Sequence, residues 1–119
     1  MRNKYVFEFQ VKFQVLYTFN LLDVHHFKFN DKDKSLILSF GDSDCYYLDM
    51  AAYDELKQKL LSLSKTLDCV CNEDRYIFLD HVSGLAMNNR GYYAKFKFVS
   101  GVLSITKTNY YLILNKMTA

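Results

Sequence analysis

The sequence has no proline, no tryptophan and only four glycines among its 119 residues. Proline and glycine are typical of linkers and sharp turns, so their scarcity argues against a hinge between domains. No apolar run approaches the roughly 18 residues that a membrane-spanning helix needs. Polar residues between Tyr5 and Phe19 also interrupt the apolar stretch that a secretory signal requires. We therefore expect one compact domain over residues 1–119, in the cytoplasm and without a membrane partner.

Metal-binding and disulfide patterns are also missing. Three cysteines, an odd number, provide no disulfide framework and are expected to be reduced thiols. Cys69 and Cys71 form a single Cys-x-Cys pair, whereas zinc sites combine two ligand clusters. His25 and His26 are adjacent, and neighbouring side chains of a strand point to opposite faces. The sequence thus predicts no metal site and no cofactor.

Acidic residues are absent after Asp80. This part of the chain carries five basic side chains, whereas the first 80 residues carry ten basic and thirteen acidic ones. The net charge of +2 therefore combines an acidic first part with a basic end. A positive field on one part of a fold attracts phosphate polymers, although many charged faces are only solvated.

Alternation of apolar and polar side chains predicts β-strands along most of the chain. Every odd position from Tyr5 to Phe19 is apolar, which is the period of a half-buried strand. A single strand of this length would span about 50 Å, so we expect a bulge, a bend or two strands. Further strands are expected at Val24–Phe29, Ser35–Phe40, Cys45–Leu48, Arg75–Leu79, Val82–Met87, Tyr92–Val99 and Val102–Thr106.

One segment changes to a helical period. Its apolar residues recur at steps of three and four and form one stripe: Tyr53, Leu56, Leu60, Leu63 and Leu67. The helix should run from about Met50 to Thr66, with Asp49 as its N-cap, before an acidic turn over residues 68–74. The apolar segment Asn109–Lys116 fits a last strand or a helical turn. The expected fold class is α+β and mostly β, with antiparallel strands and β-ribbons around one central amphipathic helix at about 50–66.

Motifs of catalysis are missing. The sequence has no Gly-x-Ser-x-Gly elbow, no phosphate-binding glycine loop and no cysteine next to a basic residue. Asp80 and His81 would need a turn to bring their side chains together. Asp42, Asp44 and Asp49 could hold a divalent cation, but a turn of solvated acidic residues is the simpler explanation. We expect a protein that is not an enzyme.

The basic end contains the strongest candidate for a binding surface. In the expected strand Tyr92–Val99, Tyr92, Ala94, Phe96 and Phe98 alternate with Tyr93, Lys95 and Lys97, which would face outward. A two-residue turn at Ser100-Gly101 would lead to the next strand. Lysines bind phosphates, and asparagines can reach base edges. The alternative is that these lysines protect an exposed strand from aggregation.

The order of elements resembles the LytTR-type DNA-binding domain of bacterial regulators, over about residues 22–116. The segments that carry the resemblance are Ile37–Gly41, Tyr46–Asp49, Tyr53–Leu56, Tyr76–Val82 and, as the closest match, Ser100–Tyr111. The resemblance implies that Lys107 contacts DNA. It also implies a basic segment where this chain has Cys71–Arg75, in which Arg75 alone is positive.

These observations together predict a small transcription regulator that binds duplex DNA. Its expected phosphate contacts and groove readers are Arg75, Asn88, Asn89, Arg90, Lys95, Lys97, Lys107 and Asn109. A homodimer is expected, since paired half-sites multiply weak contacts. The alternatives are a protein–protein interaction adaptor, phage- or plasmid-borne, with no nucleic-acid role, and, third, an uncharacterised enzyme.

Overall fold

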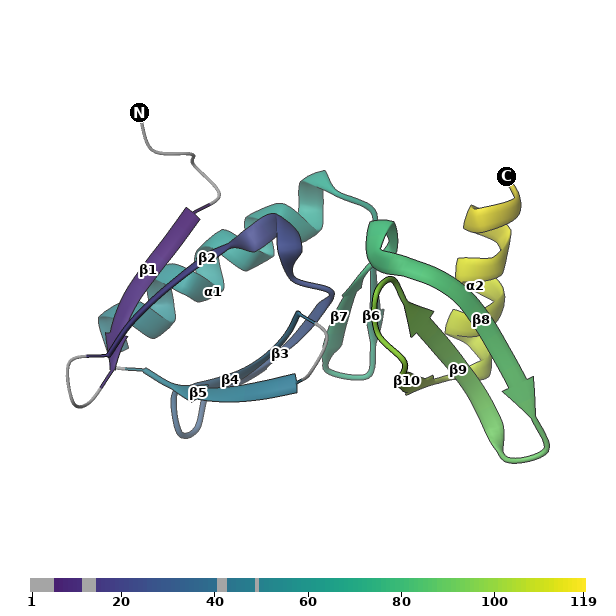
Figure 1. Cartoon of the computed structure of the whole chain (residues 1–119), viewed down its shortest axis with the longest axis horizontal. Coiled ribbons are helices and arrows are strands. Elements are labelled where there is room, and N and C mark those ends of the chain that lie inside the picture. The colour runs from purple at the N-terminus through teal and green to yellow at the C-terminus, as the bar shows by residue number, and fades with distance from the viewer. Residues whose placement is uncertain (1–5, 12–14, 41–42, 49) are drawn as a thin grey trace.

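Ten strands and two helices follow one another in the described part of the chain (Figure 1). A computed structural model describes residues 6–11, 15–40, 43–48 and 50–119. The strands are β1 (Val6–Val11), β2 (Val15–Asn20), β3 (His26–Asn30), β4 (Ser35–Ser39), β5 (Ser43–Tyr47), β6 (Cys69–Asn72), β7 (Arg75–Phe78), β8 (Val82–Asn88), β9 (Gly91–Phe96) and β10 (Val102–Ile105). The helices are α1 (Met50–Thr66) and α2 (Lys107–Thr118). The expected α+β class, mostly of antiparallel strands, is confirmed.

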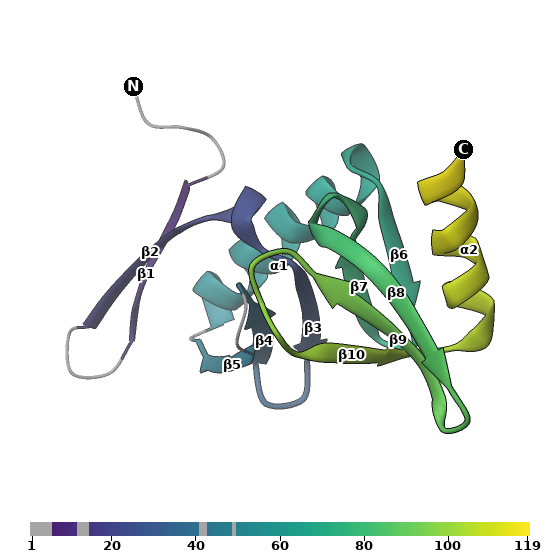
Figure 2. The same cartoon turned by 45° about the vertical axis from the view of Figure 1, so that its right-hand side comes forward.

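The strands form three antiparallel sheets. A hairpin of β1 and β2 precedes a five-stranded sheet in the order β5-β4-β3-β7-β6, and a three-stranded sheet has the order β10-β9-β8. The long alternating segment at the N-terminus is therefore two strands, paired from Val6 with Asn20 to Val11 with Val15. Figures 1 and 2 both show this hairpin at one end of the molecule and the three-stranded sheet with α2 at the other.

The five-stranded sheet has a hydrophobic cluster on each face. Because side chains alternate along a strand, Tyr76 and Phe78 of β7 belong to one cluster, whereas Ile77 between them belongs to the other. The first cluster contains the buried stripe of α1, namely Tyr53, Leu56, Leu60 and Leu63. The second joins β6 and β7 to the inner face of the three-stranded sheet and to α2.

The predicted helix is confirmed, since α1 begins and ends where expected and buries four residues of the predicted stripe; Leu67, the fifth, follows the helix. Its N-cap, expected at Asp49, lies outside the described residues. The segment Asn109–Lys116, for which the sequence fitted either a strand or a helical turn, is part of helix α2. Thr106 caps it by accepting a hydrogen bond from the Asn109 backbone N–H at 3.2 Å, and Tyr110 and Ile113 bury one side against the second cluster.

Three details of the sequence-based expectation are wrong. The acidic segment 68–74 is not all turn, because β6 occupies Cys69–Asn72 and buries Val70 and Asn72. Only Glu73 and Asp74 form the turn, with Glu73 at a φ of 57°. Strand β9 ends at Phe96 instead of continuing to residue 99. The connection to β10 is consequently a five-residue loop over residues 97–101, not a two-residue turn.

Within the described residues, neither helix combines the length and apolar character needed to cross a bilayer.

Candidate nucleic-acid interface

The three-stranded sheet turns one face toward solvent. Lys95 lies opposite Val102 on β10 and Gly84 on β8, and Tyr93 lies opposite Ser104. Directly opposed residues of antiparallel strands share a face, so these side chains form one surface. Lys95 and Ser104 are exposed, and Val102 is 53% exposed. The other face of β9, which carries Ala94 and Phe96, is buried in the second cluster.

The tip of the β8–β9 hairpin extends past β10. Strand β10 pairs with β9 only as far as Tyr92, and Figures 1 and 2 show the hairpin projecting beyond it. Asn88, Asn89 and Arg90 are all exposed at this tip. The Asn88 side-chain oxygen accepts hydrogen bonds from the backbone N–H groups of Arg90, at 2.8 Å, and Gly91, at 3.1 Å. Asn88 therefore shapes the turn that presents Arg90.

The basic residues are distributed along this sheet rather than gathered at one point. Arg90 lies at the hairpin tip and Lys95 on the open face. Lys97 follows the end of β9, where its backbone N–H donates to the His81 carbonyl at 2.9 Å. Lys107 is the first residue of α2, the helix whose Tyr110 and Tyr111 rings contact that of Tyr92. Strand β9, which lies between Arg90 and Lys97, spans about 20 Å.

Two of the predicted site residues lie elsewhere. The Asn109 side-chain amide donates to the Cys71 carbonyl at 3.1 Å and to Asn72 Oδ1 at 2.9 Å. This amide joins α2 to β6 and is engaged within the protein instead of being presented to a ligand. Arg75 lies on β7 in the five-stranded sheet, where its side chain contacts His26.

Phe98 is an exposed aromatic residue that the alternating pattern placed inward. It lies in the 97–101 loop with a φ of 66° and is fully exposed. A positive φ is rare for residues other than glycine, asparagine and aspartate. Because the Phe98 ring is exposed to water, it also lacks the stabilisation that burial of an apolar side chain provides. No local pattern announces the end of β9, because the alternation of apolar and polar residues continues through Phe98.

Two histidines contact the Phe96 ring, and the third, His81, contacts the His25 ring. The Phe96 ring lies 5.6 Å from that of His25 and 5.1 Å from that of His26, and the His25 and His81 rings are 4.7 Å apart. His81 Nε2 donates to the Leu22 carbonyl at 2.7 Å. Burial lowers the pKa of His25, and it lowers that of His26 to about 4 together with the nearby Arg75. The His25 and His26 rings are therefore mainly neutral at pH 7 and pack as part of the fold. Among the described residues, no three histidine, cysteine or acidic side chains are grouped to hold a metal.

The turn that Asp80 and His81 would need is present as a short 3-10 turn over Leu79–His81. Both residues line a cavity of about 360 Å³ with Leu21, Leu22, Leu67, Asp68 and Phe78. The His81 Nε2 is engaged by a backbone carbonyl, however, and no hydrogen bond joins the two side chains in the described structure. The geometry does not form an acid–base pair.

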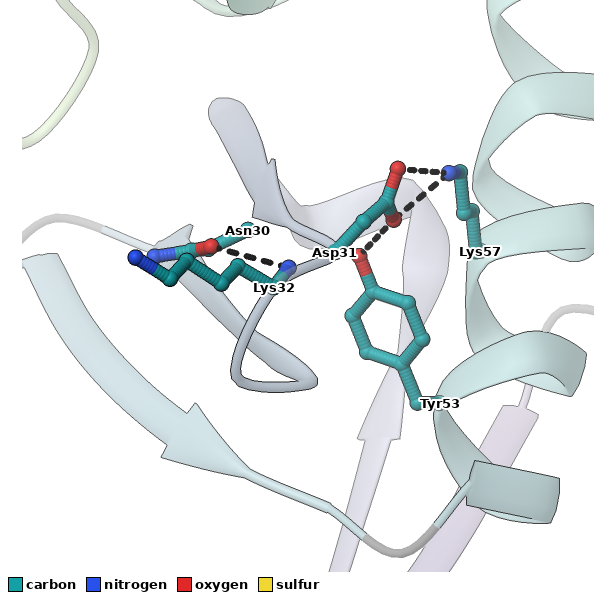
Figure 3. A network of polar contacts seen from close by, with 5 residues as sticks. All are labelled: Asn30, Asp31, Lys32, Tyr53 and Lys57. Atoms are coloured by element: carbon teal, nitrogen blue, oxygen red, sulfur yellow. Dashed lines mark hydrogen bonds and ion pairs between the residues drawn. The ribbon is translucent and has the colours of Figure 1, made fainter.

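A second polar cluster connects the β3–β4 turn to α1 (Figure 3). The Tyr53 hydroxyl donates to Asp31, and Lys57 Nζ lies 2.7 and 2.9 Å from the two Asp31 oxygens. Hydrogen bonds from Lys57 and Tyr53 lower the pKa of Asp31, whereas burial and Asp31 raise that of Tyr53. Each charge thus has its partner within the cluster, which secures the turn against the helix.

Comparison with protein-family models, curated proteins and solved structures found no match for this chain.

Proposed function

We propose that this chain is a small DNA-binding transcription regulator, which contacts duplex DNA through the β8–β9–β10 sheet. The supporting observation is that the projecting hairpin and the open sheet face lie in the part of the chain without acidic residues. Arg90, Lys95 and Lys97 provide positive charge along about 20 Å of this sheet.

The shape of the hairpin also suits a groove. The major groove of B-DNA admits a two-stranded β-ribbon, and only β8 and β9 extend to the tip. Arg90 and Asn89 would then approach base edges, while Lys95 and Lys97 contact phosphates on the flank. Lys107 would contribute a further phosphate contact. A homodimer would present two such hairpins to paired half-sites.

Salt-dependent binding to duplex DNA tests the proposal. Lys95→Ala should weaken binding and reduce the slope of log K against log salt by about one, because one phosphate contact is lost. Arg90→Ala should additionally reduce discrimination between sequences. Lys32→Ala is the matched control, since this exposed lysine lies on the β3–β4 turn between two acidic residues. The proposal would be contradicted if the wild type does not bind duplex DNA at low salt, or if Lys32→Ala loses as much DNA affinity as Lys95→Ala.

Phe98 favours a second candidate function, that of a protein–protein adaptor. Phe98, in the loop that leads to β10, and the half-exposed Val102, the first residue of β10, are both apolar side chains exposed to solvent. Aromatic anchors of this kind dominate protein interfaces. Phe98→Asn, which suits the positive φ, should abolish capture of a protein partner under this reading and leave DNA binding intact. Retained capture would contradict it.

A further inference from the structure

Two positive side chains face each other on the five-stranded sheet. Lys28 of β3 is directly opposite Arg75 of β7, so their Cβ atoms are about 5 Å apart on the same face. Like charges in this position destabilise a sheet. The described side chains place no carboxylate within 4 Å of either cation, since the ion pair found among them joins Lys57 to Asp31. In the part of the chain that the structure describes, the pair thus has no carboxylate counter-charge within 4 Å.

The contact between Arg75 and His26 does not supply that charge. Arg75 Nη1 lies 2.8 Å from His26 Nδ1. A guanidinium group only donates hydrogen bonds, so Nδ1 must accept and the imidazole must be neutral with its proton on Nε2. His26 is buried beside Phe96 and therefore holds the Arg75 side chain in one orientation. The guanidinium keeps its full charge and further N–H groups for another acceptor.

A cavity of about 130 Å³ lies where these N–H groups can reach. Its walls are Arg75 and His26 on one side, Phe96 at the junction, and Val99, Gly101, Val102 and Leu103 on the other. Strand β10 is the edge of its sheet, and an edge strand leaves alternate backbone N–H groups unpaired. The apolar walls limit screening by water, which strengthens any charge–charge contact inside. Burial accordingly lowers the pKa of Arg75.

We propose that Arg75 binds a phosphate group in this cavity, with Lys28 as the second cation and His26 as the positioning residue. A phosphate matches the arrangement because a guanidinium binds its oxygens bidentately and a nearby ammonium balances the remaining charge. Lys28 is exposed, so its flexible stem can bring the ammonium to the mouth of the cavity. Both cations belong to the five-stranded sheet, and the site does not depend on DNA binding by the β8–β9–β10 sheet.

Thermal unfolding in phosphate tests this site directly. The wild-type melting temperature should rise saturably with sodium phosphate, by a few °C at about ten times Kd, compared with sodium chloride at equal ionic strength. Arg75→Gln should remove this rise and Lys28→Gln should reduce the phosphate affinity about tenfold. Lys32→Gln should respond like the wild type. The proposal is wrong if the wild type shows no response beyond that in chloride, or if Lys28→Gln and Lys32→Gln respond alike.

The difference in melting temperature between Lys28→Gln and the wild type provides a second readout. Its sign should differ between chloride and phosphate, which a purely structural role of Lys28 would not produce. In chloride at low ionic strength, Lys28→Gln should raise the melting temperature by removing the repulsion from Arg75. In saturating phosphate the same variant should melt below the wild type, because the bound anion has lost one partner. A variant that is less stable in both buffers would overturn the proposal.

The phosphate can come from a small molecule or from a nucleic-acid backbone, and DNA titrations distinguish the two. A Lys28→Gln variant with an unchanged DNA salt slope assigns the site to free phosphate or a phosphomonoester. A slope reduced by about one, with inorganic phosphate competing against DNA, assigns it to the backbone. A failure of DNA binding alone leaves the melting experiments unaffected.

Discussion

Adjacent histidines reach the same phenylalanine, although neighbouring side chains of a strand diverge. His25 precedes the first residue of β3, and its ring stacks on Phe96 alongside that of His26. The His25 backbone is held on both sides, since its N–H donates to the Ser39 carbonyl at 2.7 Å and its carbonyl accepts from the Phe78 N–H at 3.0 Å. The result is a buried histidine cluster at the junction of the two larger sheets. Phe96 lies at its centre and is 5% exposed, whereas Phe98, two residues later, is fully exposed. Strand β9 ends at Phe96, and this end separates the buried position of Phe96 from the exposed position of Phe98.

The neutral His26 makes the stability of the protein dependent on pH. Its pKa is about 4 in the folded protein, below the ordinary 6.5, so the unfolded chain binds more protons between these values. Stability is therefore complete above about pH 6.5 and decreases as the pH falls toward 4, by up to about 3 kcal/mol from this group. Arg75 and His25 act on His26 in the same direction. Urea unfolding at pH 7 and pH 4.5 measures the difference.

His26→Gln isolates this contribution. Glutamine can still accept the hydrogen bond from Arg75 but does not titrate, so the loss of stability at low pH should become smaller. The pH dependence that remains should include that of His25, whose pKa is lowered by burial and by His81. An unchanged pH dependence in the variant would show that His26 is not responsible.

At the scale of elements, α2 is held to β6 by asparagine side chains as well as by apolar packing. Asn72 Oδ1 accepts hydrogen bonds from the Thr106 backbone N–H and from the Asn109 side chain, both at 2.9 Å. Asn72 is buried, so its oxygen has exchanged water for these two donors. Asn109, which the sequence-based prediction assigned to DNA recognition, thus helps to hold the C-terminal helix in place.

Asn72→Ala should destabilise the protein by about 2 kcal/mol, since it leaves two donors without their acceptor. Amide hydrogen exchange in α2 should increase more than exchange in α1, because α1 packs on the opposite face of the five-stranded sheet. Asn115→Ala, at an exposed position of α2, should change the free energy of unfolding by less than about 0.5 kcal/mol. Equal effects of the two substitutions would exclude a special role for the β6–α2 contact.

At the scale of the whole molecule, the five-stranded sheet connects two hydrophobic clusters. Leu56 is fully buried in the cluster beneath α1, and Ile113 is fully buried in the cluster beneath α2. Strand β7 contributes side chains to both, so neither cluster can lose its packing without exposing part of this strand. The chain is therefore expected to unfold as one cooperative unit.

Leu56→Ala and Ile113→Ala test this cooperativity. Each should lower the free energy of unfolding by about 2–5 kcal/mol through the cavity it creates. Each variant should still unfold in a single transition, with coincident curves from far-UV circular dichroism and tyrosine fluorescence. Two separate transitions in either variant would instead indicate two domains.

Local patterns determined the secondary structure because side-chain period responds to the immediate environment of each segment. The helical stripe of α1 and most strands follow from this period alone. Asp68–Asp74 misled the prediction because its charges mask the alternation in Cys69–Asn72, whose Val70 and Asn72 become buried only when α2 and β7 pack against them. The segment of helix α2 was ambiguous because its buried face, with Tyr110 and Ile113, is defined by packing against the second cluster.

The distribution of charge along the chain is also a property of the sequence, and the acid-free end is visible without a structure. Only the tertiary structure decided where its charges lie, with Arg90 at a projecting tip and Lys95 on an open face. It also placed Arg75, which precedes that end, on a different sheet opposite Lys28. Lys28 and Arg75 are far apart in the sequence, and the pairing of β3 with β7 alone brings them together. Sequence period reports which face a residue occupies, whereas the neighbours on that face depend on long-range strand pairing.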